Sequence, residues 1–514
     1  MKKSIIIVLT SILSIVITNI HAQVFVEQTG ISLSEVAMSC VDWGDYDNDG
    51  DLDILLTGID ILSVPFSKVY RNDSLASNQG RTFTELTGIN LTGVGFGSST
   101  WGDYDNDGYL DILLTGGILG SGSVSKIYRN TPTASGQGRT FTEQVGIQLP
   151  GVGQRGSSAW GDYNNDGYLD IILSGKTNYP GTYTKIYQNV PDTLGYGRTF
   201  TELTGGAPLP GVYHGSVDWV DYDNDGDLDV LLTGRIGNIE CISKIYQNDS
   251  ATNGQGRTFT EQTGIYLTGV QFGSIAWGDY DNDGDLDILL TGDTSYISVC
   301  KLYRYDSHTN TFTEQVGASI TAASGGSTAW GDYDNDGDLD ILITGMSNSL
   351  VPISKIYRND PDAYGQGRIF TEQTGISLPG VYQSSVAWAD YDNDGDLDFI
   401  LTGRVTNTIN VSKIYQNNLI TPNSISPINP VPSIMLYPNP NKGVFTLEVN
   451  SNTEKAKSFQ LEIYNILGTL IYKKDIVLGN NLQKQMNFEG LSKGLYLIRL
   501  CNEDYVLNTR FIVE

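Results

Sequence analysis

Short segments crowded with aspartate are the residues of this chain whose types and spacing best suit chemistry. The first, Asp45–Asp53, reads DYDNDGDLD and holds five aspartates and one glycine. Alternate residues of a tight loop can turn their oxygens toward one centre. Two carboxylates about 4 Å apart repel by roughly 1 kcal/mol in water and by about 4 kcal/mol at a surface-like dielectric. The loop therefore indicates a cation-binding site.

Calcium is the cation that such a loop favours, because Ca²⁺ takes many hard oxygen ligands whereas Mg²⁺ keeps more of its water. Numbering the loop one to nine, positions one, three, five and nine offer side-chain oxygens, and position seven offers its main-chain carbonyl. Gly50 at position six permits the sharp turn. An EF-hand is the first alternative, but it needs flanking helices and a Glu at position twelve, where Leu56 stands. A merely acidic turn is the second.

The loop recurs seven times at the same internal spacing, which argues against an acidic turn of no function. The sequence predicts up to seven Ca²⁺ sites. Tyr109 and Tyr168 stand at position seven of their loops, and Asn164 replaces the aspartate at position three of the third loop, which we expect to be the weakest site. The predicted ligands are Asp45, Asp47, Asp49, Asp51 and Asp53; Asp103, Asp105, Asp107, Tyr109 and Asp111; Asp162, Asn164, Asp166, Tyr168 and Asp170; Asp221, Asp223, Asp225, Asp227 and Asp229; Asp279, Asp281, Asp283, Asp285 and Asp287; Asp332, Asp334, Asp336, Asp338 and Asp340; and Asp390, Asp392, Asp394, Asp396 and Asp398.

The elements that position these loops repeat with them. Successive loops begin 53 to 59 residues apart, and every Trp of the chain stands two residues before a loop. Each unit shows four short strand patterns, and none has helical periodicity. This predicts an all-β fold, a seven-bladed β-propeller. The last unit lacks its fourth strand, and residues 24–28 supply a match, so we expect the N-terminal strand to close the last blade. An open solenoid is the alternative.

The Trp residues are interpreted as packing between neighbouring blades, with a ligand-binding stack as the alternative. Just before each inner strand stands a variable pair in otherwise constant surroundings. In a propeller these pairs lie on the face opposite the acidic loops, so they are the candidate ligand site, with filling of the channel mouth as the alternative. The candidate ligand residues are Phe96, Gln154, Arg155, Tyr213, His214, Gln271, Phe272, Tyr382 and Gln383.

The N-terminal segment, the net charge and the cysteines indicate where the protein acts and which partners it lacks. Residues 1–22 have a basic start, an apolar run and a small residue before a cleavage point, which predicts a signal peptide; a membrane anchor is the alternative. No later segment is apolar enough to cross a bilayer. The net charge of −28 argues against nucleic acid and anionic membrane surfaces. Four scattered cysteines make no disulfide framework, although a bridge between Cys241 and Cys300 stays open.

The repeated DYDNDGDLD, followed by ILLTG, resembles the FG-GAP/VCBS repeat of integrin α-subunit propellers and of secreted bacterial proteins. The resemblance covers residues 24–418. It implies Ca²⁺ in the loop between the two innermost strands of a blade and ligands on the opposite face. We therefore expect the propeller at 23–418.

The C-terminal segment differs from the repeats. Residues 419–434 are rich in Pro, Asn and Ser and predict a linker. Residues 435–514, with LYPNP, YNILG and LSKGLY, resemble the type A sorting domain of the type IX secretion system. The resemblance implies contact with that machinery, export, and then release or attachment to the outer-membrane surface. A small Ig-like sandwich that acts as a second binding module is the alternative.

No catalytic or cofactor-binding motif appears among these repeats. The leading hypothesis is a non-enzymatic protein that binds or adheres to a glycan or a surface protein. The alternative is a polysaccharide lyase or hydrolase built on a propeller.

Overall fold

The structure is a computed structural model that describes residues 22–74, 80–118, 120, 122–133, 138–177, 181–192, 197–204, 209–237, 240–250, 256–362, 367–420, 433–437, 444–450, 457–465, 470–478, 482–488, 494–501 and 506–513. The predicted signal peptide, apart from Ala22, and most of the predicted linker lie outside these residues. All elements of the described residues are strands, and these residues contain no helix able to cross a membrane. The chain divides into a larger unit, Ala22–Leu419, and a smaller one that contains Ile420–Glu514.

Seven sheets make up the described part of the larger unit, and we number them in chain order. Sheets 1 to 3 hold β2 (Ala37–Gly44), β3 (Asp53–Ile59), β4 (Pro65–Ser74) and β5 (Arg81–Glu85); β6 (Ser99–Gly102), β7 (Asp111–Ile118), β8 (Gly122–Pro132) and β9 (Arg139–Glu143); and β10 (Val152–Gly161), β11 (Asp170–Thr177), β12 (Thr182–Pro191) and β13 (Arg198–Glu202). Sheets 4 and 5 hold β14 (Val217–Val220), β15 (Asp229–Ile236), β16 (Glu240–Ser250) and β17 (Arg257–Glu261); and β18 (Gln271–Gly278), β19 (Asp287–Asp293), β20 (Ser298–Asp306) and β21 (Thr311–Glu314). Sheet 6 holds the split first strand β22 (Ala323–Ser324) and β23 (Thr328–Gly331), then β24 (Asp340–Ser347), β25 (Pro352–Pro361) and β26 (Arg368–Glu372). Sheet 7 holds β27 (Tyr382–Ala389), β28 (Asp398–Thr406), β29 (Ile409–Ile420) and β1 (Ala22–Glu27).

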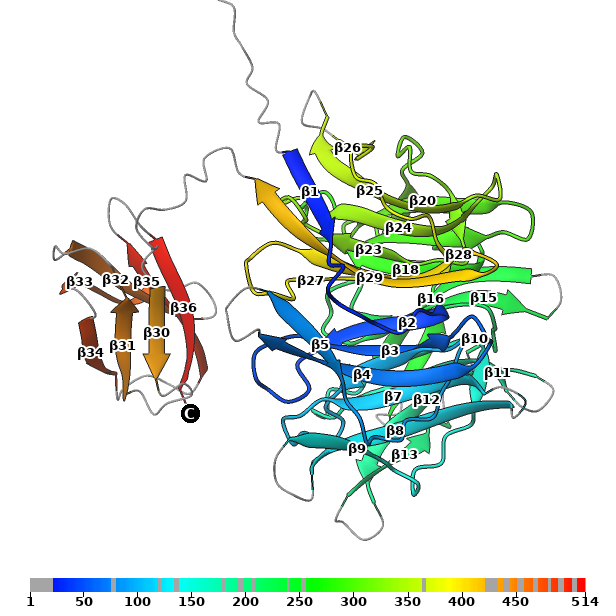
Figure 1. Ribbon diagram of the computed structural model, residues 1–514, viewed down its shortest axis with the longest axis horizontal. Helices are drawn as coiled ribbons and strands as arrows, with labels where there is room; N and C mark the ends of the chain where they lie inside the picture. Colours follow the sequence, from blue (N-terminus) through cyan, green and yellow to red (C-terminus); the bar gives the residue numbers. More distant parts are fainter. Residues whose placement is uncertain are drawn as a thin grey trace, which may run out of the picture. The chain divides into compact units, whose positions relative to one another are not determined.

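The N-terminal strand completes the last sheet. Strand β1 lies beside β29 in the order β1-β29-β28-β27, and Figure 1 shows the blue β1 next to the orange β29. The main-chain N–H of Gln28 donates to the carbonyl of Ile414 at 2.9 Å, and Lys413 pairs with Glu27 at 2.7 Å. The chain ends of the larger unit are thus joined within one sheet.

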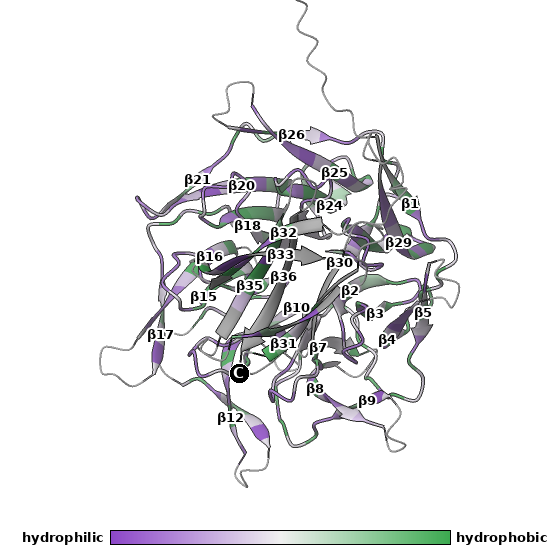
Figure 2. Cartoon of the chain, turned by 90° about the vertical axis from the view of Figure 1, so that its left-hand side faces the viewer, coloured by the Kyte–Doolittle hydropathy of each residue, from purple (hydrophilic) through white to green (hydrophobic). Residues whose placement is uncertain are grey.

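The second strand of each sheet is its most buried element. The first six residues of β3, DILLTG, are all buried, as a continuous apolar run predicts for a strand covered on both faces. In Figure 2 green, hydrophobic segments are visible on inner strands such as β18, whereas purple, hydrophilic segments are visible on third strands such as β20.

Apolar clusters fill every interface between successive sheets, including the interface between sheets 7 and 1. There Val41 and Ile54 pack with Tyr391 and Ile400. The Oγ atom of Ser39 and the Oγ1 atom of Thr402 lie 2.8 Å apart across the same interface. Because the last sheet packs on the first as its predecessors pack on one another, the sheets form a closed ring, the arrangement of a β-propeller.

The Trp residues lie in these interfaces, which confirms their interpretation as packing residues. The ring of Trp101 stacks on that of Tyr46 in the preceding sheet, with centroids 6.2 Å and planes 9° apart. The same stack recurs between Trp160 and Tyr104. The residue that follows Trp101 must be small, because a Cβ at Gly102 would stand 2.6 Å from Cδ1 of Trp160 in the next sheet.

The smaller unit also consists of strands, arranged in two sheets. One holds β30 (Ser433–Tyr437), β31 (Val444–Asn450) and β34 (Leu482–Asn487), and the other holds β33 (Leu470–Leu478), β32 (Lys457–Asn465), β35 (Gly494–Cys501) and β36 (Val506–Val513). Phe445 and Leu447 of the first sheet share a buried core with Leu461 and Ile498 of the second. The two sheets therefore pack face to face around one core.

Candidate metal sites and the opposite channel mouth

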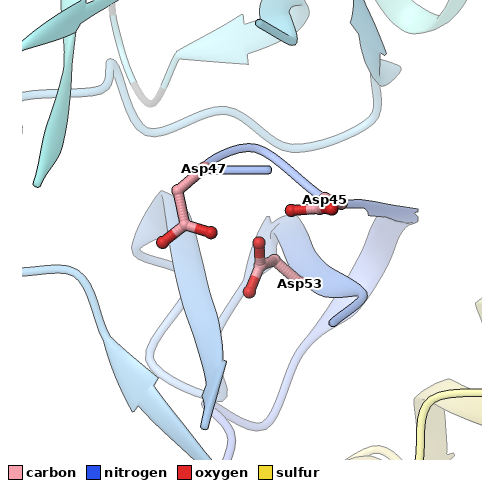
Figure 3. Close-up of side chains that lie close together, drawn as sticks. All are labelled: Asp45, Asp47 and Asp53. Carbon is pink, nitrogen blue, oxygen red and sulfur yellow. The ribbon is translucent and has the colours of Figure 1, made fainter. Parts of the chain in front are cut away.

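The acidic loops follow the inner strands of the sheets. Asp45, Asp47 and Asp53 each place one carboxylate oxygen within 4.8 Å of the others, and Figure 3 shows the three groups turned toward one region. Comparable triplets occur in further loops: Asp103, Asp105 and Asp107; Asp221, Asp223 and Asp225; Asp279, Asp281 and Asp287; and Asp332, Asp334 and Asp336.

Main-chain N–H groups hold the loop carboxylates in this arrangement. The two oxygens of Asp45 accept from Asp49 N at 3.0 Å and Gly50 N at 2.9 Å, so position one caps the turn. Asp53, at position nine and fully buried, accepts from Tyr46 N at 3.2 Å and from Asn72 N at 2.8 Å. Position four, Asn48, has a φ of 60°, a left-handed conformation that asparagine tolerates.

Position three carries the observation that points most directly to a bound cation. Its Oδ1 is buried and has no hydrogen-bond partner among the described residues in six loops, at Asp47, Asp105, Asp223, Asp281, Asp334 and Asp392. In several loops the other oxygen is held by the third strand: Asp105 Oδ2 pairs with Arg129 at 2.6 Å, and Asp223 Oδ2 accepts from Gln247 at 2.7 Å. One oxygen is thus fixed by the fold while the other faces the loop interior, and an all-oxygen cluster of this kind fits a hard cation.

The electrostatics of the loops also favour a cation. Burial, reinforced by the charges of Asp47 and Asp49, raises the pKa of Asp53 to about 8. Burial likewise raises the pKa of Asp111 to about 8 and that of Asp340 to about 9. These carboxyls hold protons at neutral pH unless a positive charge compensates them, so a cation and protons compete for the site.

The third loop differs from the other six in its side chain at position three. The Nδ2 of Asn164 at position three is buried and has no hydrogen-bond partner among the described residues, where the other six loops have an unpartnered carboxylate oxygen at this position. Its Oδ1 accepts from Asp166 N at 2.9 Å, which fixes the amide in this orientation. The arrangement is in keeping with the expectation that this site is the weakest.

In five of the seven loops the side chain at position seven contacts an arginine of the fourth strand. Asp51 hydrogen-bonds Arg81, and Asp227 hydrogen-bonds Arg257. Where position seven is tyrosine, the arginine stacks on the ring instead: Cζ of Arg139 lies 3.3 Å from the Tyr109 centroid, and Cζ of Arg198 lies 3.5 Å from that of Tyr168. Only the main-chain carbonyl of position seven is then available to a metal.

A buried asparagine on the third strand is the functional residue that sequence reasoning missed. Asn130 Nδ2 donates to the carbonyls of Leu110 in its own loop, at 3.0 Å, and of Tyr46 in the preceding loop, at 2.7 Å. The same two bonds are made by Asn72, Asn189, Asn248, Asn359 and Asn417. The recurrent triplet of Tyr, Arg or Gln, then Asn was the available signal.

The variable pairs lie at the other end of the inner strands. The sequence placed them before the strands, and this is wrong for β2, β10, β18 and β27, which include both residues of the pair. The physical reason is a bulge. The second residue has positive φ in every pair, for example 55° at Arg155 and 53° at Phe272, so the strand kinks there and continues pairing on both sides.

The second residues of the pairs surround a central channel. Their main chains link neighbouring sheets, with Arg155 N donating to Phe96 O at 2.8 Å and Phe272 N to His214 O at 2.6 Å. Five of the second residues, Phe96, Arg155, His214, Phe272 and Gln383, line a cavity of about 560 Å³ that also reaches Lys176. The first residues take other places: Tyr213 and Tyr382 bond Gly237 O and Asn407 Oδ1, and Gln271 is buried. The side chain of Gln154 lies outside the described residues.

The cysteines form no bridge in this structure. Cys40, Cys241, Cys300 and Cys501 are all free thiols. The sulfur of Cys241 lies 3.2 Å from Ser295 Oγ, and burial raises the pKa of Cys300 to about 12, so that thiol is protonated at neutral pH.

Comparison with known proteins finds two families along the chain. Residues 221–290 match an FG-GAP-like repeat, and residues 435–514 match a secretion system C-terminal sorting domain. No curated protein matches. Similar solved structures include fructan 1-exohydrolase IIa from Cichorium intybus, at 11% identity over 67% of this chain and 86% of that chain, with a TM-score of 0.28. Fructofuranosidase from Schwanniomyces occidentalis, complexed with fructose, is 11% identical over 67% of this chain and 86% of that chain, with a TM-score of 0.25.

Structural likeness at these scores carries no argument about function, whereas the two family matches agree with the motifs on which the resemblance rested. The chain contains an FG-GAP-like repeat and ends in a type IX secretion C-terminal sorting domain, which marks it as an exported protein, secreted or attached to the outer membrane.

Proposed function

We propose that this protein is a calcium-binding, seven-bladed propeller that binds a glycan or a surface protein in an adhesive role outside the cell. Each of the seven sheets is one blade, and β1 closes the last. Residues 23–418 form the propeller and 419–434 the linker. Residues 435–514 form an Ig-like sandwich that addresses the chain to the secretion machinery, after removal of a signal peptide at 1–22.

Calcium is the proposed cation because of the buried, unpartnered Oδ1 atoms at position three. With carboxylates at positions one, five and nine and the carbonyl of position seven, each loop offers an oxygen-rich set suited to the six to eight ligands of Ca²⁺. Extracellular calcium modules bind at about 10⁻⁴–10⁻³ M, a range that fits an exported protein.

The ligand-binding face is proposed to be the channel mouth, because its lining changes from sheet to sheet on a constant scaffold. The turns around it expose apolar side chains: Leu62 is 79% exposed, Tyr296 90% and Leu350 81%. Neighbouring turns also brace one another, since Ser298 and Asn348 exchange two hydrogen bonds at 2.8 and 2.9 Å. A braced platform with exposed aromatic and apolar groups suits a macromolecular ligand.

Binding is favoured over hydrolysis by the composition of this face. Among the described residues that line the channel and its mouth, none is Asp or Glu. Glycoside hydrolysis by acid and base usually requires a pair of carboxyl groups beside the scissile bond.

The test is a screen of the purified protein against glycans and surface proteins, with calcium and with EGTA. We expect a ligand whose binding needs calcium and is weakened by Phe272→Ala, but not by Tyr266→Ala, a change at an exposed tyrosine that lines neither the channel nor its mouth. New reducing ends or unsaturated products from any bound glycan would instead favour the polysaccharide-degrading enzyme.

A further inference from the structure

The channel mouth is cationic although the protein as a whole carries a net charge of −28. Arg155 and Lys176 line its 560 Å³ cavity, and Arg235 stands beside it, with Nη1 3.5 Å from Gln271 Oε1. None of the ion pairs between residues that the structure describes includes any of these three residues. Five other arginines of the repeats, in contrast, pair with loop aspartates: Arg81, Arg129, Arg257, Arg304 and Arg368.

Arg155 reaches across the channel from sheet 3 toward sheet 6. Its two terminal nitrogens lie 3.6 and 3.7 Å from the place where a Cβ of Gly325 would stand. Gly325 is the equivalent residue of sheet 6, and its missing side chain leaves the room that the guanidinium uses. On its way the guanidinium carbon passes 5.0 Å from the ring centroid of Phe272.

The cation is held without a counter-ion. Burial lowers the pKa of Arg155 to about 10, so the group stays charged at neutral pH while it has lost much of its hydration. Nε of Arg235 is buried and has no hydrogen-bond partner among the described residues. A desolvated, unpaired cation is unfavourable, and an anion that enters the site recovers part of that cost.

Aromatic rings form one wall of the same site. The ring of His214 stacks on Phe272 with centroids 4.2 Å apart, and Tyr213 lies 4.6 Å from His214. Burial and the charges of Arg155 and Arg235 lower the pKa of His214 to about 4, so the imidazole is neutral at neutral pH. Its Nδ1 is buried without a partner, and the neutral ring offers one further polar contact.

We infer that the channel mouth binds an acidic glycan, and that Arg155, with Lys176 and Arg235, holds a carboxylate or sulfate group of one sugar. This rests on the proposed ligand-binding role of the face and names the ligand class. A planar guanidinium binds carboxylate and sulfate oxygens in pairs. The cavity takes a sugar residue by volume, and Phe96, His214 and Phe272 among its lining residues give it the aromatic wall that sugar rings prefer.

Calorimetric titration of the full chain tests the inference, at one fixed free calcium concentration. The probes are trigalacturonate for carboxylates, a carrageenan oligosaccharide for sulfates, cellotriose as the neutral glycan and a Glu-rich peptide. We expect one or both acidic glycans to bind, with affinity at least tenfold above that of cellotriose. Arg155→Gln should weaken this binding about tenfold or more, whereas Lys185→Gln, the same loss of charge at an outer ion pair of the same sheet, should leave it unchanged.

The outcomes separate the inference from the proposed function. Equal binding of cellotriose, or binding unaffected by Arg155→Gln while Phe272→Ala abolishes it, overturns the anionic class but leaves a ligand site at the mouth. Tight binding of the Glu-rich peptide alone overturns the glycan assignment. If the acidic glycans bind and neither Arg155→Gln nor Phe272→Ala weakens their binding, the ligand site lies elsewhere and both proposals fail. Because Arg155 makes no ion pair, we expect Arg155→Gln to fold normally, and an unchanged melting temperature of this variant is the control.

Discussion

Asn393 donates its side-chain N–H to the main-chain carbonyl of Gly50 at 3.3 Å, across 343 positions of the sequence. The bond joins the last acidic loop to the first. Equivalent bonds join Asn48 to Gly108 at 2.8 Å and Asn106 to Gly167 at 2.7 Å. Six such bonds therefore link neighbouring loops, and we expect a change in one of these loops to affect the next.

Calcium removal should lower the stability of the larger unit. A ligand that binds only the folded state stabilises it by RT ln(1 + [L]/Kd), so sites of about 10⁻⁴–10⁻³ M contribute roughly 1.4–2.7 kcal/mol each at ~10 mM calcium. Tryptophan fluorescence measures this cleanly, because all seven Trp lie in the repeats. Equal melting temperatures in calcium and in EGTA would contradict the metal assignment, and magnesium should restore less stability than calcium.

Substitutions at position three should strengthen the calcium site of the third loop and weaken that of the second. In Asn164→Asp a carboxylate oxygen replaces the unpartnered Nδ2 of the third loop, so its calcium affinity should rise about tenfold. The reverse change Asp105→Asn should weaken the second loop by a similar factor. Calorimetry that finds the stoichiometry and affinities unchanged in both variants would show that position three does not bind the ion.

The stability of the metal-free protein should fall as the pH rises. The pKa of Asp53 is raised from 3.8 to about 8, so between these values the folded state holds a proton that the unfolded state has lost. Stability from such a group is present at low pH and is lost as the pH rises through the folded pKa. In EGTA, we expect the melting temperature to decrease from about pH 5 to about pH 8. In saturating calcium the decrease should be absent or reversed, because the ion displaces the proton; parallel curves in both buffers would be the contrary result.

Loss of one of the asparagines that link neighbouring loops should lower the free energy of unfolding of the larger unit. Asn130→Ala leaves the buried carbonyls of Tyr46 and Leu110 without their donor, at a cost of about 2–4 kcal/mol for the two bonds. Thr131→Ala, at the next position of the same strand, should cost about 0.5 kcal/mol or less. Denaturant unfolding, followed by tryptophan fluorescence, compares the two variants. Equal midpoints would mean that the asparagine does not connect the loops energetically.

The local spacing of residues in the sequence predicted much of the fold and most of the residues of the candidate metal sites. The alternation of aspartates within nine residues predicts a cation loop because those side chains are already neighbours in the chain. The run ILLTG predicts a buried strand, and the match between residues 24–28 and the missing strand of the last repeat predicts which segments pair. Each of these depends on a short pattern that is shared by the repeats and can be recognised without knowing how they pack.

The amino-acid sequence by itself thus determined the all-β repeat, the acidic loops and the sorting domain. Only the tertiary structure decided that Asn130 ties two loops together, that the variable pairs lie in bulges, and that Arg155 extends into the space left by Gly325. These relationships join residues from different sheets, often far apart in the chain. Closure of the ring brings them together, and no local period records which side chain of one repeat will face which side chain of another.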